Sequence, residues 1–140
     1  MALKWINEKL EKMVKRYKTN DPYVIAENKN IYVLKHNLHP EILGYYKYER
    51  RNKFIVLNSN YEESEQKFVC AHELGHCVFH PNFHTPFLRK NTFFSIERIE
   101  CEANYFATHL LLYNEKLEDY ETTFDLLHIN GIPEEMERFL

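Results

Sequence analysis

Residues 68–80 read FVCAHELGHCVFH, an apolar run at helical spacing that carries His72, Glu73 and His76. The two histidines stand four residues apart, so on a helix they lie one above the other, roughly 6 Å apart. At that separation both imidazoles can bind one zinc ion at about 2.0–2.1 Å. Glu73 projects beside the pair, where its carboxylate can reach a water on the metal without binding the metal itself. Because Pro81 stops the helix, this stretch predicts an H-E-x-x-H metal site near a helix end.

A catalytic zinc needs a third protein ligand and keeps one position for water. His80 continues the four-residue series, but it lies about 12 Å along the helix from His72, so the two cannot share one ion. Asn82 stands where a metzincin carries its third histidine, which excludes that pattern. His84, in the following loop, stays an alternative ligand.

The next predicted helix, residues 96–113, offers a better third ligand. It carries three carboxylates, on Glu97, Glu100 and Glu102. Glu100 stands one turn before Asn104, so one face can bind the metal and also hold a ligand histidine through its other ring nitrogen. We therefore favour Glu100, and we expect Glu97 and Glu102 to form an ordinary solvated helix face.

The other predicted elements follow from hydrophobic periodicity and from turn residues. Asp21 before Pro22 is typical of a helix start, with an N-cap followed by proline at the first helical position. Two small residues, Ala103 and Ala107, would let the second helix approach the helix of His72 closely. We expect helices over about residues 3–19, 22–28, 62–80, 96–113 and 121–128, strands over 31–34, 44–48 and 54–57, an irregular loop over 82–92, and a terminal turn over 134–140.

These elements predict one α+β domain over residues 1–140. A small three-stranded sheet should pack on the H-E-x-x-H helix and on the glutamate-bearing helix. The domain would comprise N-terminal helices and the sheet over residues 1–60, the two active-site helices over 61–113, and a helical segment over 114–140. Residues 117–140 of that segment could form the wall of a groove or a docking surface, or could belong to the core.

Composition narrows the classes of function. The net charge is -3 with histidine neutral, and the one basic cluster, residues 12–18, is typical of the solvated face of the first helix, so direct nucleic-acid binding is not expected. No apolar run approaches the roughly 18 residues that span a membrane, and the N-terminus has no signal-peptide core. An odd cysteine number (Cys70, Cys77 and Cys101) without a C-x-x-C pair predicts reduced thiols, packed in the core, in a cytoplasmic protein.

Two stretches together resemble the ImmA/IrrE family of zinc metallopeptidases. They are FVCAHELGH at residues 68–76, with His80 after it, and IECEANYFA at residues 99–107. Their pairing is far more specific than H-E-x-x-H alone. The chain departs from the family in carrying Tyr113 where a proline often follows, which leaves the path after the second helix open.

The resemblance implies a compact gluzincin-like fold, with zinc held by His72, His76 and Glu100 and with Glu73 as the catalytic base. It also implies a role, because small stand-alone members look like anti-repressors of phages and mobile elements that cleave a helix-turn-helix repressor. The expected protein is thus a cytoplasmic zinc endopeptidase with a protein substrate and no membrane partner. His80 occupies a recurring family position, and we assign it to supporting the site.

The expected mechanism has Glu73 accept a proton from the attacking water and pass it to the leaving amine. Tyr105 and His109, on the second helix, are candidates for a further donor to the oxyanion. The rival function is a non-proteolytic module with structural zinc that inactivates a repressor by docking. Three protein ligands rather than four favour catalysis. A DNA-binding regulator is weaker still, since no helix-turn-helix pattern accompanies the metal site.

Overall fold

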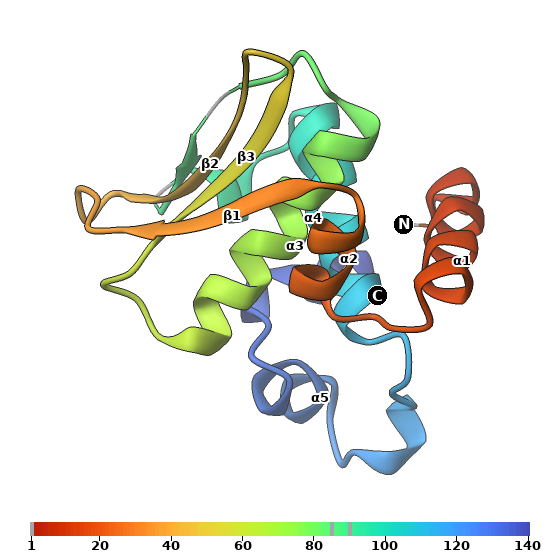
Figure 1. The fold of residues 1–140 in the computed structure, drawn as a ribbon. Helices are drawn as coiled ribbons and strands as arrows, with labels where there is room; N and C mark the ends of the chain where they lie inside the picture. The colour runs from red at the N-terminus through yellow and green to blue at the C-terminus, as the bar shows by residue number, and fades with distance from the viewer. Residues whose placement is uncertain (1, 85, 90) are drawn as a thin grey trace.

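The computed structural model describes residues 2–84, 86–89 and 91–140, and it places a small sheet against a stack of helices (Figure 1). α3 packs on the sheet and on α4, and α1 packs on α4 in turn. This arrangement confirms the predicted α+β class. In chain order the elements are α1 (Lys4–Tyr17), α2 (Pro22–Asn28), β1 (Ile31–His36), β2 (Ile42–Glu49), β3 (Asn52–Asn58), α3 (Glu63–Phe79), β4 (Phe87–Leu88), η1 (Thr92–Phe94), α4 (Arg98–Leu111), η2 (Leu117–Asp119), α5 (Thr123–Ile129) and η3 (Glu134–Phe139).

The sheet has the strand order β1-β3-β2-β4, with β1 parallel to β3 and the other two pairs antiparallel. Alternation along the strands buries Tyr46 and Ile55, which are paired in register, in the core beside α3. The opposite face carries Tyr32 and Phe54, whose rings stack with centroids 5.3 Å apart. Among the described residues the sheet therefore has one strand more than the three predicted, because β4 lies in the segment that was expected to be an irregular loop.

The helix boundaries agree with their local signals. α2 begins at Pro22, and the carboxylate of Asp21 accepts a hydrogen bond of 2.9 Å from the backbone N–H of Tyr23. α3 ends at Phe79, with His80 as its C-cap before Pro81. No helix that the structure describes is long and apolar enough to cross a membrane.

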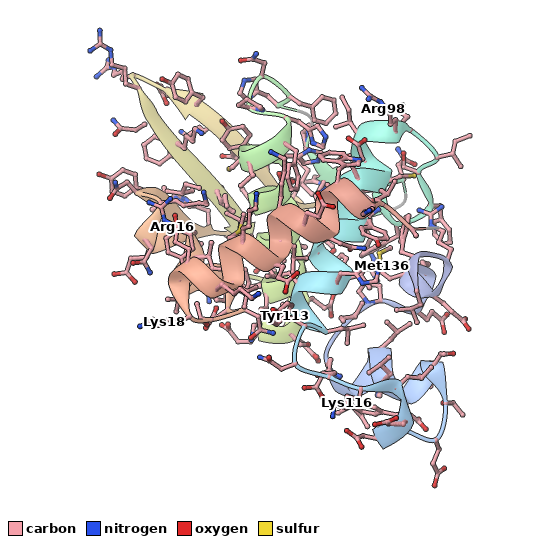
Figure 2. The ribbon with its side chains drawn as sticks, turned by 90° about the vertical axis from the view of Figure 1, so that its right-hand side faces the viewer. Arg16, Lys18, Arg98, Tyr113, Lys116 and Met136 are labelled. Carbon is pink, nitrogen blue, oxygen red and sulfur yellow. The ribbon has the colours of Figure 1, made fainter. Side chains whose placement is uncertain are left out.

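The basic cluster of α1 is a solvated face, as predicted. Ile6, Leu10, Met13 and Val14 face the core, whereas the lysines and Arg16 of residues 12–18 are exposed. Figure 2 shows α1 lying in front of α4, with Arg16 and Lys18 pointing outward at its C-terminal end.

The chain after α4 contributes Leu126, Leu127, Ile132, Met136 and Phe139 to the core, whereas residues 113–119 are exposed. α4 ends at Leu111, and the chain passes through η2 and α5 before η3 packs back against α4. Leu127 and Phe139 are each 1% exposed, while Phe124 and Leu140 are exposed. The sequence left the path beyond Tyr113 open, and the structure shows that the C-terminus returns to pack on α4.

Gly44 on β2 lies where no side chain fits. A Cβ at this position would lie 2.7 Å from the carbonyl oxygen of Val56 and 2.7 Å from Cγ1 of Val69 on α3. Because β2 and α3 must separate to admit it, Gly44→Ala is expected to lower the free energy of unfolding by about 1–3 kcal/mol. Urea unfolding of the metal-free protein measures this, and a midpoint at or above that of the wild type would contradict it.

The three cysteines are free, and Cys70 and Cys77 are buried whereas Cys101 is partly exposed. Burial raises the pKa of the Cys70 and Cys77 thiols, which keeps them protonated and unreactive. Cys101 is only partly buried, and its Sγ donates to the carbonyl of Ser95 at 3.3 Å. We expect a thiol reagent to modify Cys101 alone in the native protein and all three after unfolding, read by mass spectrometry. Fast native labelling of Cys70 would show that α3 opens.

Candidate metal centre

Close approach of α3 and α4 builds the site. Ala103 and Ala107 on α4 are fully buried, as the prediction of a tight helix pair requires. On α3 the matching position is Gly75, where a Cβ would lie 3.1 Å from Cδ2 of Phe106 and 3.5 Å from Cα of Ala103. The glycine inside the H-E-x-x-H motif therefore contributes to helix contact, a role that the sequence analysis did not assign to it.

Three ligand-type atoms from the two helices point at one place. Nε2 of His76 lies 3.0 Å from Nε2 of His72 and 2.6 Å from Oε1 of Glu100, and His72 Nε2 lies 3.3 Å from that same oxygen. Ligands on a tetrahedral zinc at about 2.0–2.1 Å would be roughly 3.4 Å apart, so small side-chain shifts would admit the ion. Ligand-type atoms of Glu73 also lie within 4.8 Å of the two histidines.

The protonation states suit metal binding. Burial lowers the pKa of His76 to about 4, so its ring is neutral at pH 7, which is the form that a metal requires. Burial alone would raise the pKa of Glu100, but hydrogen bonds with His72 and His76 outweigh it and lower this pKa to about 2. The site thus offers a neutral imidazole on His76 and an ionised carboxylate on Glu100.

Glu73 is a buried carboxylate without a hydrogen-bond partner. The residue is 1% exposed, and neither side-chain oxygen is paired among the residues that the structure describes. Burial, and then the charge of Glu100, raise the pKa of this carboxyl well above its usual value. Because an unpaired buried carboxylate is costly, its presence beside three convergent ligands fits a site built for a cation and water.

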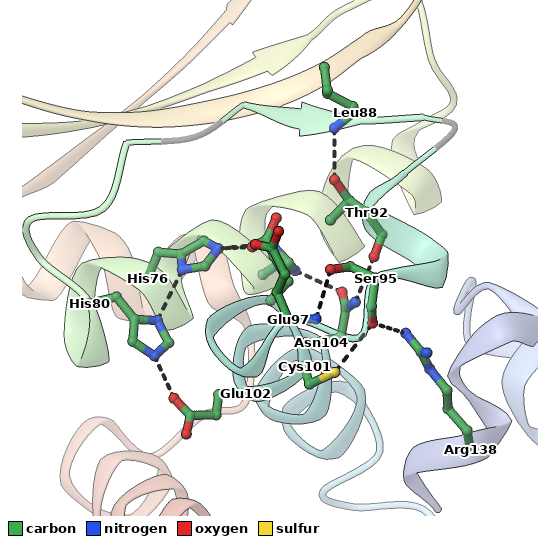
Figure 3. Close-up of polar contacts among 12 residues, drawn as sticks. His76, His80, Leu88, Thr92, Ser95, Glu97, Cys101, Glu102, Asn104 and Arg138 are labelled. Atoms are coloured by element: carbon green, nitrogen blue, oxygen red, sulfur yellow. Dashed lines mark hydrogen bonds and ion pairs between the residues drawn. The ribbon is translucent and has the colours of Figure 1, made fainter.

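Hydrogen bonds fix the orientation of His72. Its Nδ1 lies 2.8 Å from Oδ1 of Asn104, as the sequence analysis proposed for this amide. The Nδ2 of Asn104 in turn donates to the carbonyl of Thr92 at 3.0 Å, and the Thr92 hydroxyl accepts from the N–H of Leu88 (Figure 3). Only the nitrogen of the Asn104 amide can donate to the Thr92 carbonyl, so the amide oxygen is the atom that faces the His72 ring.

A second chain of contacts runs from His76. His76 Nδ1 lies 3.0 Å from Nδ1 of His80, and His80 Nε2 lies 2.7 Å from Oε1 of Glu102 (Figure 3). Glu102 is buried, so the expectation of a solvated side chain is wrong for it. Glu97 is exposed, as expected.

The remaining sequence candidates lie elsewhere. His84 is exposed and stacks on Tyr46 with ring centroids 5.3 Å apart. The hydroxyl of Tyr105 donates to Oδ1 of Asn7 on α1 at 3.0 Å. Nε2 of His109 lies 2.7 Å from the carbonyl oxygen of Phe139 in η3. These two residues are therefore engaged against α1 and η3, and their suggestion as oxyanion donors is wrong.

Aromatic rings border the site, and a cavity lies elsewhere in the fold. Phe83 packs 5.0 Å from the His76 ring and Phe87 packs 4.6 Å from the His72 ring, measured between centroids. A cavity of about 600 Å³ is lined by Phe68 of α3, and the described residues that line it include none of His72, Glu73, His76 and Glu100. Its lining includes the charged side chains of Glu62, Glu65, Arg89 and Glu135, together with His128.

Comparison with known proteins agrees with this geometry. A peptidase family model, Peptidase_M78, described as the IrrE N-terminal-like domain, matches residues 26–135. The uncharacterized immunity region protein 2 of Bacillus phage phi105 is 45% identical over 135 residues, which cover 94% of this chain and 85% of the relative. The metallopeptidase ImmA of Bacillus subtilis strain 168 is 28% identical over 116 residues, covering 83% of this chain and 68% of the relative.

Proposed function

The chain belongs to the peptidase family of IrrE N-terminal-like domains, and we propose that it is a zinc-dependent endopeptidase that cuts a protein substrate. The observation that carries the proposal is the convergence of His72 Nε2, His76 Nε2 and Glu100 Oε1 beside the unpaired carboxylate of Glu73. Three protein ligands leave one position for water, which is the arrangement of catalytic rather than structural zinc.

The residues of the site divide the work. His72, His76 and Glu100 would hold the zinc, which supplies Lewis-acid activation of water and of the scissile carbonyl. Glu73 takes the proton that the attacking water gives up and passes it to the leaving amine. Asn104 keeps the His72 ring in place through the 2.8 Å hydrogen bond.

Access requires a local movement. The metal-facing residues His72, Glu73 and His76 are each at most 1% exposed, with Phe83 and Phe87 packed on the two rings. A peptide would therefore reach Glu73 only when these aromatic side chains move aside. Such a gate also excludes water from a site in which charge develops during the reaction.

For the substrate we propose a helix-turn-helix repressor, which would make the protein an anti-repressor that acts in the cytoplasm. The relative from a phage immunity region and the relative named ImmA support this choice.

Incubation of the purified, zinc-loaded protein with candidate repressors from the same genome tests the proposal. Intact-mass spectrometry should show two fragments of one repressor that sum to its mass plus one water, and a chelator should prevent their appearance. A complex that forms without fragments, with zinc present, would instead favour the docking module and overturn the assignment as a peptidase.

A further inference from the structure

The hydrogen-bond chain that leaves the metal centre through His76 ends on a carboxylate that the proposed mechanism does not use. The side chains of His80 and Glu102 are each 9% exposed, and they contact each other at 2.7 Å. A carboxylate withdrawn from water needs a partner, and His80 is the one that this structure gives Glu102. At its other nitrogen, Nδ1, His80 contacts Nδ1 of His76, a proposed ligand, at 3.0 Å.

One arrangement of protons lets His76 bind a metal through Nε2. That atom, which faces Glu100 at 2.6 Å, must then carry no proton, so the ring proton sits on Nδ1. His76 Nδ1 therefore donates to His80 Nδ1, and His80 Nε2 donates to Glu102. Every donor in this arrangement meets an acceptor, and the chain of hydrogen bonds ends on the carboxylate of Glu102.

The two ligand histidines are consequently supported in different ways. The proton on His72 Nδ1 is received by the neutral amide of Asn104, at 2.8 Å. The proton on His76 is received by a second imidazole, that of His80, which the carboxylate of Glu102 holds in place. A carboxylate behind a ligand histidine fixes its tautomer and ring orientation and makes it a stronger ligand.

We infer that Glu102 is a positioning residue of the metal centre, which acts through His80 to hold His76 in its metal-binding tautomer. The inference rests on the proposed function, because it takes His76 as a metal ligand. Glu102 itself contacts neither the metal nor the substrate in this scheme, so its effect is exerted on affinity for the ion before any chemistry.

Zinc affinity of the full-length Glu102→Ala variant tests the inference. Outer partners of metal ligands typically contribute about 10–100-fold to metal affinity, so the zinc Kd is expected to rise by about that factor. Competition with a chromophoric chelator gives the Kd, and circular dichroism confirms that the variant is folded. Glu97→Ala is the matched control, since Glu97 is an exposed glutamate at the start of the same helix and should leave the Kd unchanged. A folded E102A protein with the wild-type Kd overturns the inference.

Long-range ¹H–¹⁵N correlation spectra of the zinc-loaded wild type test it without any substitution, which decides the matter if E102A does not fold. His80 should carry its proton on Nε2 and His76 on Nδ1, and a His80 protonated at Nδ1 would overturn the inference. The two proposals fail separately. A wild type that retains no zinc ends the proposed function, whereas a zinc-binding, active wild type with an unaffected E102A ends only the role of Glu102.

Discussion

Replacing Glu73 by glutamine is expected to abolish peptide cleavage while zinc binding stays stoichiometric. Glutamine has nearly the same shape as glutamate but cannot accept the proton of the attacking water. General acid–base groups typically contribute about 10²–10⁴-fold to a rate, so cleavage should fall by at least that much. Fragment yield by intact-mass spectrometry and zinc content by elemental analysis are the two measurements.

The same substitution should not weaken the fold. Both oxygens of Glu73 lack hydrogen-bond partners among the described residues, so the neutral side chain removes a buried unpaired carboxylate. The unfolding midpoint of the metal-free protein is therefore expected to equal or exceed that of the wild type. Glu63→Gln is the matched control, because Glu63 lies on the same helix but pairs with Lys35 at the surface. An E73Q protein that cuts at the wild-type rate would remove Glu73 from the chemistry without removing the metal.

The parts of the metal centre that could be predicted from sequence are those governed by local geometry. His72 and His76 share one helix, so their spacing alone places the rings together. Glu102 and His80 belong to two helices, and their contact depends on how α4 crosses α3. Helical geometry places Glu102 about 160° around α4 from Glu100, so the position of Glu100 alone does not predict that Glu102 is buried. The contact arises because His80, the C-cap residue of α3, lies beside α4 where the two helices pack.

Helical geometry could also have excluded His109 as an oxyanion donor. His109 follows Glu100 by nine residues, which places it about 180° away around α4, on the face that packs against η3. Strand β4, in contrast, has only two residues, too few to show alternation, and its partner Ile42 lies far back in the chain. Its formation depends on a long-range pairing that no local pattern carries.

Replacing Glu100 by alanine is expected to remove the metal rather than only slow the reaction. Structural zinc sites with four ligands are worth about 10–16 kcal/mol, roughly 3 kcal/mol per ligand, so the zinc Kd should rise at least about 100-fold. Glu97→Ala again serves as the control, since its carboxylate is exposed on the same helix. An E100A protein with wild-type zinc affinity would mean that another group, such as His84, supplies the third ligand.

Zinc concentration separates the roles of Glu100 and Glu73. A weakened ligand set can be refilled by mass action, so excess zinc should restore metal occupancy, and part of the cleavage, in the E100A protein. The E73Q protein already holds its metal, so added zinc should restore nothing. Fragment yield measured against zinc concentration therefore tells a lost ligand from a lost base. If E73Q recovered with zinc, Glu73 would belong among the ligands, and the assignment of a separate proton acceptor would be wrong.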